Sequence, residues 1–271
     1  MTLARLLCRI LTELVFMLFN VVCTELEGTS GMEKRTLQIY GIPAIIYGTS
    51  SRKVFLYVHG QGGYKEEAEN FANIACQFGY QVLSVDLPEH GDRKGVTNSF
   101  DPWHIVPELS SMMDYAKSQW KYISLFANSV GAWFSMLSLE KEKLEKCLFV
   151  SPVLDMKQLI SKMMVWANVS EARLKEERVI PTTFGHTLTW EYWTYTLSHP
   201  IVNWTTPTRI LYGENDSLIE RDTVDQFVRK YHCKLTVMEK GEHRFHTEQQ
   251  LAIMSKWVRK ELNSKLILRE R

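Results

Sequence analysis

The sequence predicts an α/β protein with a mostly parallel central sheet and helices on both faces of that sheet. Strand-like and helix-like segments alternate along most of the chain, and the strand-like segments are almost continuously apolar. Such alternation is typical of crossover connections between parallel strands, and an unbroken apolar run indicates a strand covered on both faces. The length of 271 residues fits one large domain with an insertion, or at most two domains.

The first half of the chain supplies most of the expected sheet. A short antiparallel pair is predicted at 37–41 and 44–47, around a Gly-Ile-Pro turn. The buried strands that follow are expected at 53–59, 81–86, 122–127 and 146–151. Apolar residues at helical spacing predict the helices between them, at 66–78, 107–120 and 130–139.

The alternation stops between residues 154 and 205. That segment has no strand signal, and its helical stretches are rich in Trp, Tyr and Met. The pattern then resumes with strands at 208–212 and 234–238 and helices at 220–231 and 249–262. We therefore expect a helical insertion in an otherwise continuous α/β core.

The first 31 residues form an N-terminal extension with three open interpretations. They are an overlong reading frame with the true start at Met32, a weak membrane anchor or signal-like segment, or an ordinary helix. The apolar run at 14–23 is shorter than the roughly 20 residues that span a bilayer, so no stable membrane span is expected.

The bulk composition is that of an ordinary globular protein. Hydrophobic residues make up 45% and charged residues 23%, and the net charge of +1 gives no reason to expect nucleic acid as a partner. The five cysteines are an odd number without a C-x-x-C pair, which argues against a disulfide framework or a zinc site. We expect a reducing, cytoplasmic location and no metal.

The segment Ala127-Asn128-Ser129-Val130-Gly131 lies between a predicted strand and a predicted helix. A serine on such a tight turn is exposed as a nucleophile, and small residues two before and two after it let the strand and helix pack closely. Alone, the short string fits equally well a helix start with Ser129 as N-cap.

A glycine-rich loop, His59 to Gly63, directly follows the first buried strand. A tetrahedral oxyanion needs preorganised backbone N–H donors, and we assign these to Gln61 and Val130. The alternatives are a phosphate-binding loop or a plain turn, but the sequence has no nucleotide-binding glycine pattern.

An acid and a base follow the last two predicted strands. Asp216 comes after the strand at 208–212, and His243 after the strand at 234–238. Asp is also common as a turn residue, and a lone loop His is often only solvated. His246 is a rival base, and Asp155 and Glu214 are rival acids.

With these segments together, the chain from about Leu37 resembles the α/β-hydrolases. The resemblance also uses Asp86-Leu-Pro-Glu-His-Gly91, which is similar to a loop in many members, and the order Ser129, Asp216, His243. It implies about eight strands, with a helical cap inserted after the sixth. The expected core is then 32–153 and 206–271, and the cap is 154–205.

The resemblance implies a serine hydrolase that needs no cofactor and acts on a small-molecule ester or thioester with a small to medium apolar acyl group. Alternatives are a carbon–carbon or amide bond hydrolase, or a non-catalytic binding member of the fold. Trp166, Trp190 and Trp193 either line the substrate pocket or pack the cap onto the sheet. The sequence does not predict the oligomeric state.

Overall fold

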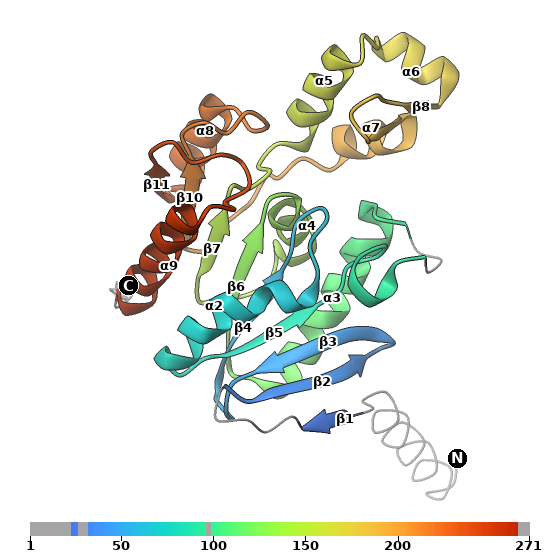
Figure 1. Ribbon diagram of the computed structural model, residues 1–271. Helices are drawn as coiled ribbons and strands as arrows, with labels where there is room; N and C mark the ends of the chain where they lie inside the picture. The colour runs from blue at the N-terminus through green and yellow to red at the C-terminus, as the bar shows by residue number, and fades with distance from the viewer. Residues whose placement is uncertain (1–22, 27–31, 96–98, 265–271) are drawn as a thin grey trace, which may run out of the picture.

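A nine-stranded sheet forms the centre of the computed structural model, which describes residues 23–26 (backbone only), 32–95 and 99–264 (Figure 1). Its strands from β5 to the far edge confirm the predicted parallel architecture, since every pair among them is parallel, whereas β3 joins β5 in antiparallel orientation. In spatial order the strands are β1 (Cys23–Leu26), β2 (Lys34–Ile39), β3 (Ile42–Tyr47), β5 (Gln81–Val85), β4 (Lys53–Val58), β6 (Tyr122–Asn128), β7 (Cys147–Val150), β10 (Thr208–Gly213) and β11 (Lys234–Met238).

Helices cover both faces of this sheet and bury one apolar cluster on each. One cluster holds buried side chains of α3 (Pro102–Gln119), α4 (Val130–Leu139) and α8 (Arg221–Tyr231). The other holds those of α2 (Ala68–Ala75) and α9 (Glu248–Asn263). Short 3₁₀ turns complete the connections: η1 (Lys65–Glu67), η2 (Cys76–Phe78) and η3 (Gly91–Arg93).

Two local predictions were wrong. The β2–β3 turn consists of Tyr40 and Gly41, both with positive φ (52° and 79°), whereas Pro43 lies inside β3. Two-residue hairpin loops favour this primed geometry, because it matches the twist of the strands. Helix α3 begins at Pro102, five residues earlier than predicted, because the Asp101 side chain caps it and proline suits a first helical position.

The insertion lies between β7 and β10 and sits beyond the carboxyl ends of the strands (Figure 1). It contains the predicted helices but also a two-stranded antiparallel sheet, so the expectation of no strand in this segment was wrong. Each of these strands has three residues, too few for an alternating pattern to be recognised. The elements are α5 (Met156–Trp166), α6 (Glu171–Glu177), β8 (Val179–Pro181), β9 (Thr187–Thr189) and α7 (Trp190–Ser198).

The N-terminal extension falls mostly outside the described residues, so its three interpretations stay open. Its described part is β1, which adds a ninth strand beside β2 in antiparallel orientation. Among the helices that the structure describes, none combines the length and apolar character needed to cross a bilayer.

Candidate active site

Ser129 occupies a strained turn between β6 and α4. Its backbone has φ 49° and ψ −124°, a conformation that residues with a side chain rarely adopt. Hydrogen bonds hold it there: the Ser129 N–H donates to the Val150 carbonyl at 3.0 Å, and the Val153 N–H donates to the Ser129 carbonyl at 3.0 Å. The turn therefore fixes the direction in which the Ser129 hydroxyl points.

Glycine is required beside this turn for close packing. A side chain at Gly131 would run into the backbone carbonyl oxygen of His59, at the end of the neighbouring strand β4. Ala127, on the strand side of the turn, is completely buried. The small residues thus let the start of α4 lie directly against the end of β4.

His243 and Asp216 lie in line with the Ser129 hydroxyl. The Ser129 Oγ lies 2.8 Å from His243 Nε2, and His243 Nδ1 lies 2.8 Å from Asp216 Oδ2. A carboxylate can only accept a hydrogen bond, so His243 Nδ1 carries the ring proton and donates it to Asp216. His243 Nε2 is then the acceptor for the Ser129 hydroxyl. The other carboxylate oxygen of Asp216 accepts from the Leu218 and Ile219 N–H groups at 2.9 and 2.8 Å, which fixes the acid in place.

The two loops that carry the acid and the base are tied to each other. The Asn215 N–H donates to the Gly241 carbonyl at 2.7 Å, and the Lys240 N–H donates to the Glu214 carboxylate at 3.0 Å. A side chain at Gly213 would run into the Glu242 carbonyl oxygen. Close backbone approach between β10 and β11 therefore positions Asp216 against His243.

The structure does not bring the rival residues to Ser129. His246 is 57% exposed and lies 3.2 Å from the Glu242 carboxylate. Asp155 caps α5 by accepting from the Gln158 N–H at 3.0 Å. Glu214 is the carboxylate that holds the neighbouring loop.

The glycine-rich loop packs against the serine turn. A Cβ atom placed on Gly60 would lie 3.1 Å from the Ser129 Cβ. Gln61 and Val130 both line the same cavity as Ser129, and neither backbone N–H donates to another group in the described part of the chain. Two backbone donors are therefore free beside the serine, where an oxyanion would form.

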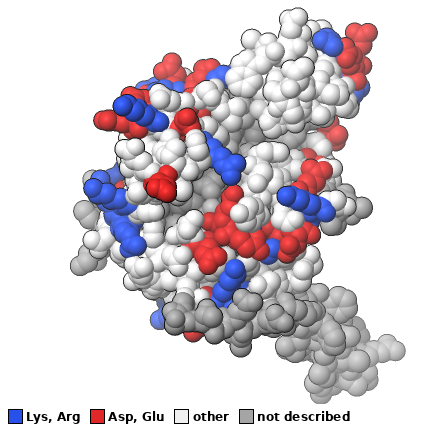
Figure 2. Space-filling view, viewed as in Figure 1, with Lys and Arg blue, Asp and Glu red and all other residues white. Residues whose placement is uncertain are grey.

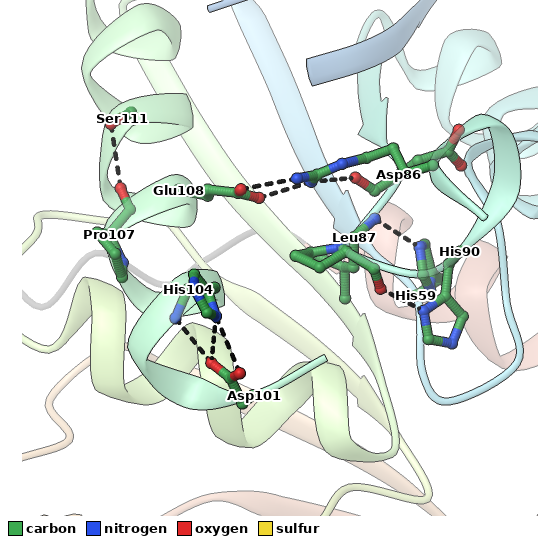
Figure 3. Close-up of polar contacts among 11 residues, drawn as sticks. His59, Asp86, Leu87, His90, Asp101, His104, Pro107, Glu108 and Ser111 are labelled. Carbon is green, nitrogen blue, oxygen red and sulfur yellow. Dashed lines mark hydrogen bonds and ion pairs between the residues drawn. The ribbon is translucent and has the colours of Figure 1, made fainter. Parts of the chain in front are cut away.

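Two histidines to which the sequence assigned no role of their own hold this loop, and Figure 3 shows how they lie beside Leu87. The His59 ring donates from Nδ1 to the Gly60 carbonyl at 2.8 Å and accepts the Leu87 N–H at Nε2, at 3.1 Å. The His90 ring accepts the Gly62 N–H at Nε2, at 2.8 Å. His59 is fully buried, and this burial lowers its pKa to about 4, so the ring stays neutral and keeps its acceptor.

A buried ion pair anchors the end of the same loop. The Lys65 ammonium lies 2.9 Å from the Asp86 carboxylate and 2.7 Å from that of Asp92, and the Lys65 N–H also donates to Asp86 at 2.8 Å. Burial lowers the pKa of Lys65, but the carboxylates outweigh it and raise the pKa overall. A side chain at Gly91, where φ is +53°, would run into the Asp86 carboxylate. The Asp86–Gly91 segment is thus a structural clamp on the glycine-rich loop.

A cavity of about 1300 Å³ opens onto Ser129 and His243. The insertion forms one wall, which is largely apolar and includes Met156, Ile160 and Tyr192. No three His, Cys, Asp or Glu side chains in the described ranges are arranged to hold a metal ion.

The predicted tryptophan lining does not match this cavity. Trp166, Trp190 and Trp193 are absent from its wall, and the tryptophan that lines it is Trp103. Trp193 is 4% exposed within the apolar cluster, and Trp166 is 48% exposed and packs edge-on against Phe184. These rings stabilise the insertion, which was the other interpretation of their spacing.

Comparisons with known proteins identify the fold through solved structures. No protein-family model and no curated protein matches the chain. The ferulic acid complex of Est1E from Butyrivibrio proteoclasticus is similar with a TM-score of 0.68 at 17% identity, covering 82% of this chain and 95% of that one. Alpha/beta hydrolase domain-containing protein 10 from mouse has a TM-score of 0.67 at 12% identity, covering 89% and 98%. The thioesterase domain from the curacin biosynthetic pathway has a TM-score of 0.56 at 16% identity, covering 84% and 99%.

TM-scores of 0.56 to 0.68 over more than four-fifths of this chain show a shared fold. At identities below 20%, these similarities show the fold only, and the activity has to be inferred from the site. The chain has the α/β-hydrolase fold.

Proposed function

We propose that this protein is a serine hydrolase that cleaves a carboxylic ester or thioester of a small to medium apolar acyl group. The observation that carries the proposal is the line of hydrogen bonds from Ser129 through His243 to Asp216 at the floor of a large cavity. A hydroxyl held against a neutral imidazole, itself held by a buried carboxylate, is the arrangement that activates a serine nucleophile.

The proposed reaction uses each group in turn. His243 takes the Ser129 proton as the hydroxyl attacks the substrate carbonyl, and Asp216 stabilises the resulting imidazolium. The Gln61 and Val130 N–H groups bind the oxyanion, and His243 then gives the proton to the departing alcohol or thiol. Water, deprotonated by the same imidazole, attacks the acyl-enzyme and releases the acid.

The apolar wall of the cavity supports the proposed acyl group. Met156, Leu159, Ile160 and Met163 all lie on α5 and line this wall, and the insertion would act as a cap over the substrate. Apolar cavities bind apolar groups by removing their surface from water. The similar structures include an esterase from Pyrococcus furiosus and a thioesterase domain, which supports both bond types.

The unpaired cysteines support the proposed reducing, cytoplasmic location. Cys76, Cys147 and Cys233 are free thiols, and Cys147 and Cys233 are buried. They pack as small apolar side chains, which suits a compartment in which thiols stay reduced.

The test is active-site labelling combined with turnover. We expect a fluorophosphonate probe to label Ser129 and the protein to hydrolyse p-nitrophenyl butyrate. Ser129→Ala should lose both the label and the turnover while keeping its circular dichroism spectrum and melting temperature. A folded parent protein that neither reacts with the probe nor differs from Ser129→Ala would overturn the proposal.

A further inference from the structure

The sheet supplies a second wall of the cavity, whose residues differ in kind from those of the insertion. It is formed on the face of the sheet that α2 and α9 cover, and it includes Tyr57, Phe71 and Phe126. These three rings contact one another, with centroids 4.2 to 6.1 Å apart. The second wall is therefore an aromatic base, and polar groups from β4, β6 and η1 lie beside it.

Several polar atoms on this side have no partner. Asn128 donates from Nδ2 to the Tyr57 hydroxyl at 2.9 Å, but its Oδ1 is buried and accepts nothing from the described residues. Ser151 also lines the cavity and is only 2% exposed, and its buried hydroxyl has no hydrogen-bond partner among the described residues. Buried polar atoms are nearly always hydrogen-bonded, so unpaired acceptors beside a cavity point to a ligand with donors.

Glu67 adds a carboxylate to the same side. It lines the cavity next to Gly63, and no described residue makes a hydrogen bond or ion pair with its side-chain carboxylate. Burial raises the pKa of the Glu67 carboxyl, and Arg244 opposes the increase from a distance. Burial and, to a smaller extent, the Glu67 charge raise the pKa of Tyr57, and both residues line the same cavity. A half-buried carboxylate without a partner would gain by binding a cation.

The charge of the whole cavity favours the same kind of ligand. Acidic side chains gather on this face of the molecule, below the insertion (Figure 2). Two arginines line the cavity, Arg178 and Arg244. Six carboxylates line it as well, from Glu66, Glu67, Glu69, Glu89, Asp101 and Glu191. Carboxylates therefore outnumber arginines in this wall, and an excess of negative charge favours a positively charged ligand.

The position of His243 decides which end of the ester, the acyl group or the alcohol, lies near Glu67 and Asn128. The imidazole must face the leaving oxygen in order to protonate it. Arg244 and Phe245, which directly follow His243, line the cavity, and Phe245 packs against the apolar cluster of α2 and α9. The leaving alcohol therefore departs toward Glu67, and the acyl group lies against the insertion.

We propose that Glu67, Asn128 and Tyr57 form a subsite that binds a protonated amine carried by the alcohol part of the ester. The inference rests on the proposed function, because it assigns the leaving group of that same reaction. The single ammonium N–H donates to the Glu67 carboxylate, the unpaired Asn128 Oδ1 faces the positive charge, and the aromatic base contacts the alkyl groups of the amine.

The first experiment compares two isosteric esters. 2-(Dimethylamino)ethyl butyrate and 3-methylbutyl butyrate differ by N⁺–H in place of C–H, and both are assayed at neutral pH. We expect kcat/KM to favour the amine ester by about tenfold, the size of one hydrogen bond to a charged group. Glu67→Gln should reduce this ratio to near one, whereas Glu248→Gln, an equal charge change outside the cavity wall, should keep it.

The second experiment measures binding without turnover. 2-(Dimethylamino)ethanol is titrated into Ser129→Ala and into the Ser129→Ala, Glu67→Gln double variant, with ligand-observed NMR as the readout. We expect saturable binding to the first variant and at least a tenfold weaker affinity for the second. Equal binding to both, or none to either, overturns the subsite even if the esters are hydrolysed. Loss of probe labelling and of all turnover with Glu67-dependent binding intact would instead overturn the proposed function.

Discussion

The carboxyl edge of the sheet and the insertion above it enclose one cavity, but they hold their residues in different ways. At the sheet edge, backbone hydrogen bonds and close glycine contacts fix each group, as at Ser129, Gly131 and Gly213. In the insertion, side chains such as Met156 and Ile160 are positioned by apolar packing. The first kind of support depends on single residues, and the second is shared among many.

This difference predicts different tolerance to substitution. Apolar packing accepts exchanges of similar volume, usually at a cost of less than about 1.5 kcal/mol. A backbone approach that only glycine permits accepts no side chain without movement of the chain. Chemistry should therefore be sensitive at the sheet edge, and substrate range should be adjustable in the insertion.

The largest effect should separate the two nearby histidines. We expect His243→Ala to lower kcat/KM for p-nitrophenyl butyrate by about 10⁴ or more, because it removes the proposed base. His246→Ala, three residues along the same loop, should change it by about twofold at most, since His246 has no contact with Ser129. Similar losses in both variants would contradict the assignment of His243 and the comparison built on it.

The second effect compares one lysine from each region. Lys65→Met should lower the free energy of unfolding by about 4 kcal/mol, because it leaves the buried Asp86 carboxylate without its cation. Lys162→Met in α5 should cost about 1 kcal/mol, since its ion pair with the exposed Glu220 at 3.6 Å and its hydrogen bond to the Ser217 carbonyl at 2.9 Å both lie at the surface. Urea unfolding followed by tryptophan fluorescence measures both. Equal costs would show that the clamp at the sheet edge is no stronger than a surface pair.

The third comparison is between two tryptophans of the insertion. Trp193→Ala should destabilise the protein by about 3 kcal/mol, because Trp193 is buried and its loss leaves a cavity. Trp166→Ala should change stability by less than about 1 kcal/mol, since that ring is half exposed. Neither variant should alter fluorophosphonate labelling of Ser129. A labelling defect in Trp193→Ala with folding intact would mean that the two regions are coupled.

The smallest effect is a pH dependence of stability from His59. Its pKa is about 4 in the folded protein and about 6.5 when exposed, so protons bind the unfolded chain more tightly. The contribution is complete above pH 6.5 and decreases as the pH falls toward 4, by at most about 3 kcal/mol. Urea unfolding at several pH values should show a shallower decline in His59→Gln than in the parent protein. Parallel declines would exclude His59 as the source.

The sequence predicted the regions where a local pattern determines the structure. Predicted and observed bounds agree for α4 and β11, because each has a clear apolar pattern and a clear stop. Ser129, Asp216 and His243 were proposed from their positions after strands, and the structure brings them together. Their catalytic roles remain proposals.

The features that the sequence did not predict depend on contacts between segments that are distant along the chain. Strands β8 and β9 are too short to show a period, and the cavity lining by Trp103 depends on how α3 meets the insertion. His59 and His90 hold the glycine-rich loop through backbone groups, which leave no trace in residue types. Tyr57 lies on β4 and Asn128 on β6. If the pairing of these two strands had been known, their register and the alternation of side chains would have placed both residues on the same face of the sheet.

The order of the site along the chain has a consequence for biosynthesis. Ser129 lies 114 residues before His243, and the base is reached only after β11 has been added at the edge of the sheet. A ribosome-bound chain that has emerged only as far as α8 carries the serine turn but no general base. Since a domain generally folds as a unit, the proposed enzyme stays inert until its final strand has been synthesised and has paired, and activity reports complete folding.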